Sequence, residues 1–329
     1  MKEKRLFKFG ILALSIVLIA CTGGSAEAGC PEIDGREINV VATTPMIGEF
    51  VSQVGGDNIN LTVLMPAEAD PHTYDPAPQD AGTIADADLV FYTGLKYEPA
   101  ALIKLLENSV CSAEVLAEVG ESVFPIEFKE GGHDDHHDDH DEEGHDDHAG
   151  HDHGAYDPHF WFDPNRVAYA AEYIESKLVE FDPSNASEYE AAGKAYVTEL
   201  KGLVGQVSEL ISTIPSQNRK LITTHESLGY LEAKFGLEVL STVIPSLDSA
   251  NEISPSQLVG VIDVIEDNNV KVIFIEAEAP SVYAETIVAE TGIKAVEGLW
   301  VETLKEGQSY SEFLFDAVEL IVENLRNTD

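Results

Sequence analysis

Short apolar runs alternate with amphipathic segments twice along this chain of 329 residues, and this alternation constrains the fold more than any other feature. Apolar runs separated by helical patterns are typical of parallel strands joined by crossover helices. The expected strands are 38–44, 59–66 and 87–94 in the first round, and 220–225, 237–244, 270–277 and 293–299 in the second. We therefore expect an α/β protein of two similar lobes, each built on a mostly parallel sheet.

One long amphipathic pattern separates the two rounds. It begins near Asn185 and ends at Pro215, and its residues 196, 200, 203, 207, 210 and 214 are apolar or Tyr at helical spacing. Glu188, three residues after Asn185, predicts a capping box at its start. A helix of this length would reach about 40 Å, close to one domain diameter.

These patterns divide the chain into a first lobe (37–182), a connecting helix (183–217) and a second lobe (218–329). A continuous helix is a poor hinge, because bending it breaks backbone hydrogen bonds. We therefore expect little motion between the lobes.

The first twenty residues have the pattern of an export signal. A basic start, MKEKRLFKFG, precedes the apolar run ILALSIVLIA, which is too short to span a bilayer comfortably. LIAC, at residues 18–21, resembles a bacterial lipobox, which predicts a lipid on Cys21 and a polar tether over 21–36. The alternative is an ordinary signal peptide with an incidental cysteine. We expect an exported protein, either anchored to the outer face of the cytoplasmic membrane or periplasmic.

Two cysteines, Cys30 and Cys111, remain in the exported part of the chain. Disulfides form outside the reducing cytoplasm, so a bond between them is plausible, and two separate buried thiols are the alternative. Neither cysteine has the close partner that a structural zinc site requires.

A stretch rich in His, Asp and Glu fills residues 129–154 and contains no aliphatic side chain larger than that of Ala149. Such a stretch cannot form a core, so it is predicted to be a disordered surface loop. We expect its histidines to bind several metal ions loosely, as accessory ligands. They are His133, His136, His137, His140, His145, His148, His151 and His153.

The acidity of the chain extends well beyond this loop, to a formal net charge of −41. Such a charge argues against nucleic acid and anionic lipid as partners, because both are polyanions. A cationic ligand is electrostatically favoured.

Three further histidines stand outside the loop. His72 lies in DPHTYDP after the second expected strand, His159 lies in DPHFWFDP after the loop, and His225 ends the first strand of the second lobe. Ligands of open α/β sheets bind beyond the carboxyl ends of the strands. Each histidine alone is explained more simply as a hydrogen-bonded turn or core residue, but three in matching positions favour convergence on one divalent metal between the lobes.

Three imidazole nitrogens and one oxygen are a ligand set that suits Zn²⁺. The oxygen is expected from a carboxylate of the second lobe, and Glu276, Glu278 and Glu302 all lie at or beyond the end of a strand. Spacing does not separate these three candidates. Because imidazole binds a metal only when neutral, the affinity should fall below a pH of about 6.5.

A zinc hydrolase is the alternative from another class of protein. His225 begins the sequence HES, but Gly229 stands where an HExxH motif needs its second histidine. The chain also has no nucleophile elbow and no Gly-rich phosphate loop. We therefore expect a binding protein and not an enzyme. A metal-buffering or adhesion lipoprotein that relies on the 129–154 loop is a third hypothesis.

DPHTYDP and DPHFWFDP carry a family resemblance. They are similar to the first-histidine segment and the Asp-Pro-His-x-Trp segment of the metal-specific solute-binding proteins of ABC transporters, and the likeness covers nearly the whole mature chain. The resemblance implies two lobes joined by a rigid helix, with His72 and His159 as ligands from the first lobe. His225 stands at a position that is His in zinc receptors and usually Glu in manganese receptors.

The same resemblance nominates a fourth ligand. LWVETL resembles the segment where manganese receptors place an aspartate, which implies Glu302 rather than Glu276. Zinc members tend to leave this position to water, which is the remaining alternative. The 129–154 loop resembles an insertion seen mainly in zinc members.

The function implied by the resemblance is high-affinity Zn²⁺ capture by a monomer that delivers the ion to a membrane permease. A Mn²⁺ or Fe²⁺ receptor of the same family is the alternative.

Overall fold

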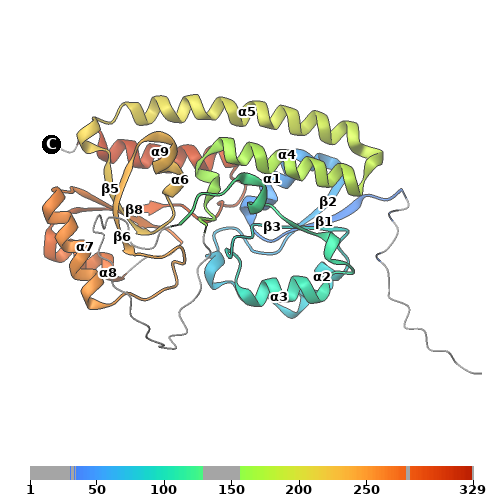
Figure 1. The fold of residues 1–329 in the computed structure, drawn as a ribbon, viewed down its shortest axis with the longest axis horizontal. Helices are drawn as coiled ribbons and strands as arrows, with labels where there is room; N and C mark the ends of the chain where they lie inside the picture. Colours follow the sequence, from blue (N-terminus) through green and yellow to red (C-terminus); the bar gives the residue numbers. More distant parts are fainter. Residues whose placement is uncertain (1–29, 31–32, 34, 129–155, 279–281, 328–329) are drawn as a thin grey trace, which may run out of the picture.

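Two four-stranded sheets form the framework of the chain, which the computed structural model describes at residues 30, 33, 35–128, 156–278 and 282–327 (Figure 1). All strand pairs are parallel, and the orders are β2-β1-β3-β4 and β6-β5-β7-β8. The two sheets therefore share one topology, which confirms the expectation of two similar α/β lobes. The strands are β1 (Ile38–Ala42), β2 (Ile59–Val63), β3 (Leu89–Tyr92), β4 (Leu116–Glu118), β5 (Lys220–His225), β6 (Glu238–Ile244), β7 (Val272–Glu276) and β8 (Lys294–Leu299).

Helices follow most of the strands, and several begin at the capping residues that the sequence offers. Thr44, Ser254 and Ser309 each accept a backbone N–H of the helix that they start. The α-helices are α1 (Pro45–Gly55), α2 (Pro78–Ala85), α3 (Ala100–Ser109), α4 (Pro164–Phe181), α5 (Ala186–Ser212), α6 (Gly229–Phe235), α7 (Pro255–Asn268), α8 (Val282–Thr291) and α9 (Tyr310–Leu325). Two short 3₁₀ helices, Pro71–Thr73 and Phe160–Phe162, lie next to predicted ligands.

The long helix α5 spans both lobes. Figure 1 shows it running over α4 of the first lobe and α9 of the second, and it packs against both. Asn185 is the N-cap residue, but its side chain caps no helical N–H and instead donates to Asp182. The predicted capping box is therefore wrong, whereas the predicted apolar stripe is largely buried. Its buried members are Tyr196, Leu200, Leu203, Val207 and Ile214.

One continuous hydrophobic core lies beneath α5 and contains residues of both lobes. Phe50 of α1 packs edge-on against Tyr310 of α9, with ring centroids 5.4 Å apart. The ring centroids of Phe162, just before α4, and Phe313 of α9 are 5.7 Å apart. A shared core resists separation of the lobes, because separation would expose apolar surface to water.

Several features expected from the sequence lie outside the described residues. They are the signal segment 1–20, Cys21, most of the tether, and the eight loop histidines. Within the described ranges, no helix combines the length and apolar character needed to cross a membrane.

Cys30 and Cys111, which are 81 positions apart in the sequence, form a disulfide with Cα atoms 5.1 Å apart. Of the two alternatives left open by the sequence, the structure therefore has the bonded one. The bond ties the segment before β1 to the chain just after α3.

We expect the double variant Cys30→Ser, Cys111→Ser to lose about 2–4 kcal/mol of unfolding free energy, because the bond restricts the unfolded chain. Urea titration measures this loss, and reduced wild-type protein serves as the matched control. Metal affinity should stay unchanged, since the predicted ligands lie elsewhere. An unchanged urea midpoint would show that the bond does not stabilise the fold.

Candidate metal centre

Four segments of the chain bring the predicted ligands together. His72 lies in a 3₁₀ helix beyond β2, where its backbone N–H donates to Asp70 at 3.0 Å. His159 precedes the 3₁₀ helix that leads into α4, His225 is the last residue of β5, and Glu302 follows β8. His159, His225 and Glu302 are fully buried, and the side chain of His72 is 5% exposed. The centre thus lies where strands of both sheets end.

One oxygen is the focus of this cluster. Oε1 of Glu302 lies 2.7 Å from Nε2 of His225, 3.2 Å from Nε2 of His159 and 3.4 Å from Nε2 of His72. The four candidate ligand atoms all lie within 4.8 Å of one another. Nε2 of His72 and Nε2 of His225 are buried, and neither makes a hydrogen bond of good geometry to any described residue. Buried polar atoms are normally satisfied, so these two nitrogens suit a metal ion.

Carboxylates behind two of the histidines orient the rings. Nδ1 of His159 lies 2.8 Å from Asp157 Oδ1, and Nδ1 of His225 lies 2.5 Å from Glu276 Oε2. A protonated Nδ1 held by a carboxylate leaves Nε2 as the metal-binding nitrogen. Glu276 also accepts the backbone N–H of His225 and the hydroxyl of Ser227.

Tyr97 fixes the other oxygen of Glu302. Its hydroxyl donates to Oε2 at 2.8 Å and lies 3.1 Å from the Glu302 carbonyl oxygen. Its ring also lies edge-on to His72 and His159. Tyr97 was not among the residues predicted from the sequence, although it follows β3 and the strand-end rule that selected the histidines also applies to it.

The three carboxylates left as alternatives have different positions. Glu302 lies in the cluster, whereas Glu276 stands behind His225 and bonds to the far side of its ring. Glu278 accepts the backbone N–H groups of residues 301–303, in the loop that carries Glu302. The structure therefore brings Glu302 to the three histidines and does not bring Glu276 or Glu278.

Burial and charge act against each other on the titrating groups. Burial alone would raise the pKa of Glu302, but His159 and His72 hold that pKa well below its usual range. Burial lowers the pKa of His159, but Glu302 and Asp157 outweigh it and raise the pKa to about 9. The pKa of His225 lies well above its ordinary value, because Glu276 outweighs the effect of burial. A metal that binds these histidines at neutral pH must therefore displace protons.

The pKa of Glu278 is raised to about 8, and burial of its side chain is the main cause. The backbone hydrogen bond from Glu302 opposes this effect, and the charge of Glu302 adds to it.

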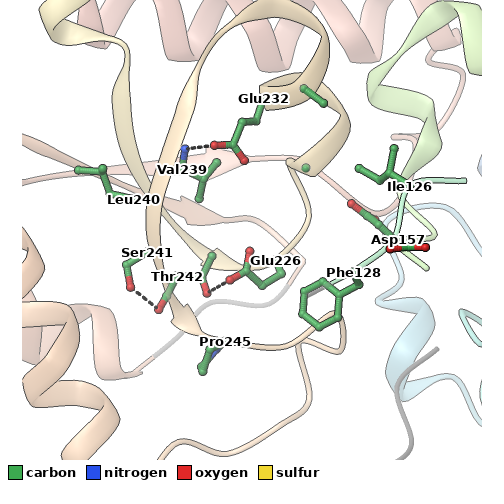
Figure 2. A pocket seen from close by; sticks show the side chains of 13 residues that line it. Ile126, Phe128, Asp157, Glu226, Glu232, Val239, Leu240, Ser241, Thr242 and Pro245 are labelled. Carbon is green, nitrogen blue, oxygen red and sulfur yellow. Dashed lines mark hydrogen bonds between the residues drawn. The ribbon is translucent and has the colours of Figure 1, made fainter. Parts of the chain in front are cut away.

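Two cavities flank the centre. One of 970 Å³ reaches His72 and Tyr97 and is lined on the second-lobe side by Leu247 and Asp248. The other, of 510 Å³, is drawn in Figure 2, where Asp157 and Glu226 lie on its walls. Asp157 holds His159 and Glu226 adjoins His225, so this second cavity lies behind the ligands.

Two parallel-sheet lobes over a shared core, with a buried cluster of imidazoles and a carboxylate between them, define a bilobed metal-binding protein. The chain belongs to the family described as zinc-uptake complex component A, periplasmic, whose sequence profile matches residues 40–327. Members are solute-binding receptors of ABC transporters. The chain is therefore the extracytoplasmic metal-binding component of such a transporter and not an enzyme.

Individual relatives are named for different metals. The chain is 29% identical to the high-affinity zinc uptake system protein ZnuA of Bacillus subtilis, over 96% of each chain. It is 24% identical to the manganese-binding lipoprotein MntA of Halalkalibacterium halodurans, again over 96% of each chain. The fold is that of the periplasmic zinc-binding protein TroA from Treponema pallidum, with a TM-score of 0.74 at 22% identity, covering 88% of this chain and 99% of that one.

We expect metal affinity to rise steeply as the pH increases from 6 to 9. Below about 9, His159 must lose a proton before Nε2 can bind, which costs up to about tenfold in affinity per pH unit, and the raised pKa of His225 adds to this cost. The rise therefore extends well above the value of about 6.5 expected for an unperturbed imidazole. Competition titrations from pH 6 to 9 measure the affinity.

The matched control is Asp157→Asn, which removes a charge that raises the pKa of His159 and should make the affinity less dependent on pH between 6 and 9. Calorimetry in two buffers of different ionisation enthalpy should detect proton release at pH 7. An affinity independent of pH above about 6.5 would contradict this account of the raised histidine pKa values.

Proposed function

We propose that the chain is a high-affinity Zn²⁺ receptor that delivers the ion to an ABC permease and is anchored by a lipid on Cys21. His72, His159, His225 and Glu302 are the proposed ligands. The observation that carries the proposal is the convergence of three Nε2 atoms on a single carboxylate oxygen.

The dimensions of the cluster support zinc. Four ligand atoms at about 2.0–2.1 Å from a tetrahedral Zn²⁺ lie roughly 3.3–3.4 Å from one another. Oε1 of Glu302 lies 2.7, 3.2 and 3.4 Å from the three nitrogens. Two of these three distances are close to the tetrahedral value, and the four ligand atoms all lie within 4.8 Å of one another, so the side chains must still move to enclose a four-coordinate ion.

A Mn²⁺ receptor is the second candidate, because relatives such as MntA are named for manganese. Mn²⁺ prefers six ligands and more oxygen than this cluster offers. The Tyr97 hydroxyl occupies Oε2 of Glu302, so the carboxylate presents only Oε1 to an ion. Three imidazoles and a carboxylate that offers one oxygen form a ligand set that favours Zn²⁺ over Mn²⁺. By the Irving–Williams order, the same ligand set binds Cu²⁺ at least as tightly as Zn²⁺, so the availability of each metal decides which ion is carried.

The acidic histidine loop at 129–154 has an accessory role in this proposal. Its end lies five residues before His159, which tethers it beside the proposed ligands. We propose that it gathers or senses Zn²⁺ near the centre. A metal-buffering lipoprotein would instead depend on this loop for all of its metal binding.

Metal titration of three forms of the protein separates these functions. Wild-type protein and a form lacking residues 131–154 should each retain one tightly bound Zn²⁺, whereas His159→Ala should weaken that binding at least about 100-fold because one of four ligands is lost. Loss of tight binding on deletion of the loop would instead favour the buffering function. Equal affinity of His159→Ala and wild type would exclude the proposed centre.

We expect Tyr97→Phe to lower the preference for Zn²⁺ over Mn²⁺, because the change frees Oε2 of Glu302 to bind an ion. Competition between the two metals measures the preference. Tyr92→Phe is a suitable control, since the Tyr92 hydroxyl donates to Glu118 away from the centre. An unchanged preference in Tyr97→Phe would show that the hydroxyl does not limit the carboxylate to one oxygen.

A further inference from the structure

Glu278 has an unusual set of partners for a buried carboxylate. Its Oε1 accepts three successive backbone N–H groups, from Val301 at 3.0 Å, Glu302 at 2.9 Å and Thr303 at 3.2 Å. Its Oε2 is buried and has no hydrogen-bond partner among the described residues. Among the described residues, the hydrogen bonds that Glu278 receives from beyond its own backbone therefore all come from residues 301–303, in the loop that presents Glu302.

The carbonyl groups of the same loop are held from the first lobe. Trp161 Nε1 donates to the Val301 carbonyl at 2.8 Å, and the Tyr97 hydroxyl, which donates to Oε2 of Glu302, also lies 3.1 Å from the Glu302 carbonyl oxygen. The backbone N–H of Glu68 donates to the Leu304 carbonyl at 3.2 Å. First-lobe donors thus fix the loop relative to His72 and His159, and Glu278 fixes it relative to the second lobe.

From this arrangement we propose that Glu278 is a positioning residue for metal selectivity: it holds the 301–303 turn so that Glu302 directs Oε1 at all three histidines. The inference rests on the proposed zinc function and extends it to a residue that touches no ion. Of the three nitrogens, Nε2 of His225 lies closest to Oε1 of Glu302, at 2.7 Å, and both residues belong to the second lobe that Glu278 braces.

The physical cost of losing Glu278 follows from the burial of the loop. Val301, Glu302 and Thr303 are fully buried, so their N–H groups would have to find other acceptors by moving the turn. If the 301–303 turn moves, Oε1 of Glu302 points in a different direction, and the four-coordinate geometry becomes looser. Outer partners of metal ligands typically contribute 10–100-fold to affinity.

The test uses Glu278→Ala and Glu278→Gln in the full-length protein. Glutamine keeps an acceptor oxygen for the three N–H groups, and its amide nitrogen takes the place of the unpartnered Oε2. Glu297→Ala is the matched control, because Glu297 is an exposed carboxylate on β8, the strand that leads into the same loop. The measurements are Zn²⁺ and Mn²⁺ affinities, the visible spectrum of bound Co²⁺ and the melting temperature without metal.

We expect Glu278→Ala to weaken Zn²⁺ binding about 10–100-fold, to narrow the Zn²⁺-over-Mn²⁺ preference and to reduce the intensity of the Co²⁺ bands that mark tetrahedral coordination. Glu278→Gln should restore all three readouts to within a few fold of wild type, and Glu297→Ala should match wild type.

A merely structural role predicts a different pattern. If Glu278→Ala lowers the melting temperature but leaves the metal preference and the Co²⁺ spectrum unchanged, the positioning role is overturned. Failure of the zinc function is detected separately, because it appears in the wild-type protein as a preference for Mn²⁺.

Discussion

The buried Glu302 carboxylate is the interaction on which the rest of the centre depends. A charged carboxylate without solvent is costly unless it is paired, and here three imidazoles, one phenol and a clamped backbone turn surround it. The charge of Glu302 is the main cause of the raised pKa of His159, and the charges of His159 and His72 lower the pKa of Glu302, whereas Glu276 is the main cause of the raised pKa of His225. In the proposed function a divalent cation replaces the protons of these histidines, which couples capture and release of metal to proton exchange.

The fold holds this carboxylate between two lobes. The first lobe contributes His72 and His159, and the second contributes His225 and Glu302. The helix α5 and the shared core beneath it fix the distance between the two pairs. Because each lobe contributes only two of the four proposed ligands, the candidate centre requires both lobes.

Much of this arrangement could be predicted from the sequence, because long apolar runs identify strands and strand ends identify ligand positions. β4, with three residues, and α2, rich in small residues, carry too little hydrophobic periodicity to be recognised. Glu276, Glu278 and Glu302 satisfy the strand-end rule equally well. Only their hydrogen bonds distinguish the carboxylate that faces the histidines from the one that orients His225 and the one that holds a turn. Such differences depend on long-range packing, which local pattern does not encode.

The coordination shell of the bound ion is the most direct test of the central claim. X-ray absorption spectroscopy on protein lacking residues 131–154 and loaded with one equivalent of Zn²⁺ removes the signal of the eight loop histidines. The account predicts a four-coordinate ion with three imidazole nitrogens and one carboxylate oxygen, all at about 2.0–2.2 Å. A six-coordinate, oxygen-rich shell, or a shell with fewer than three imidazoles, would contradict it.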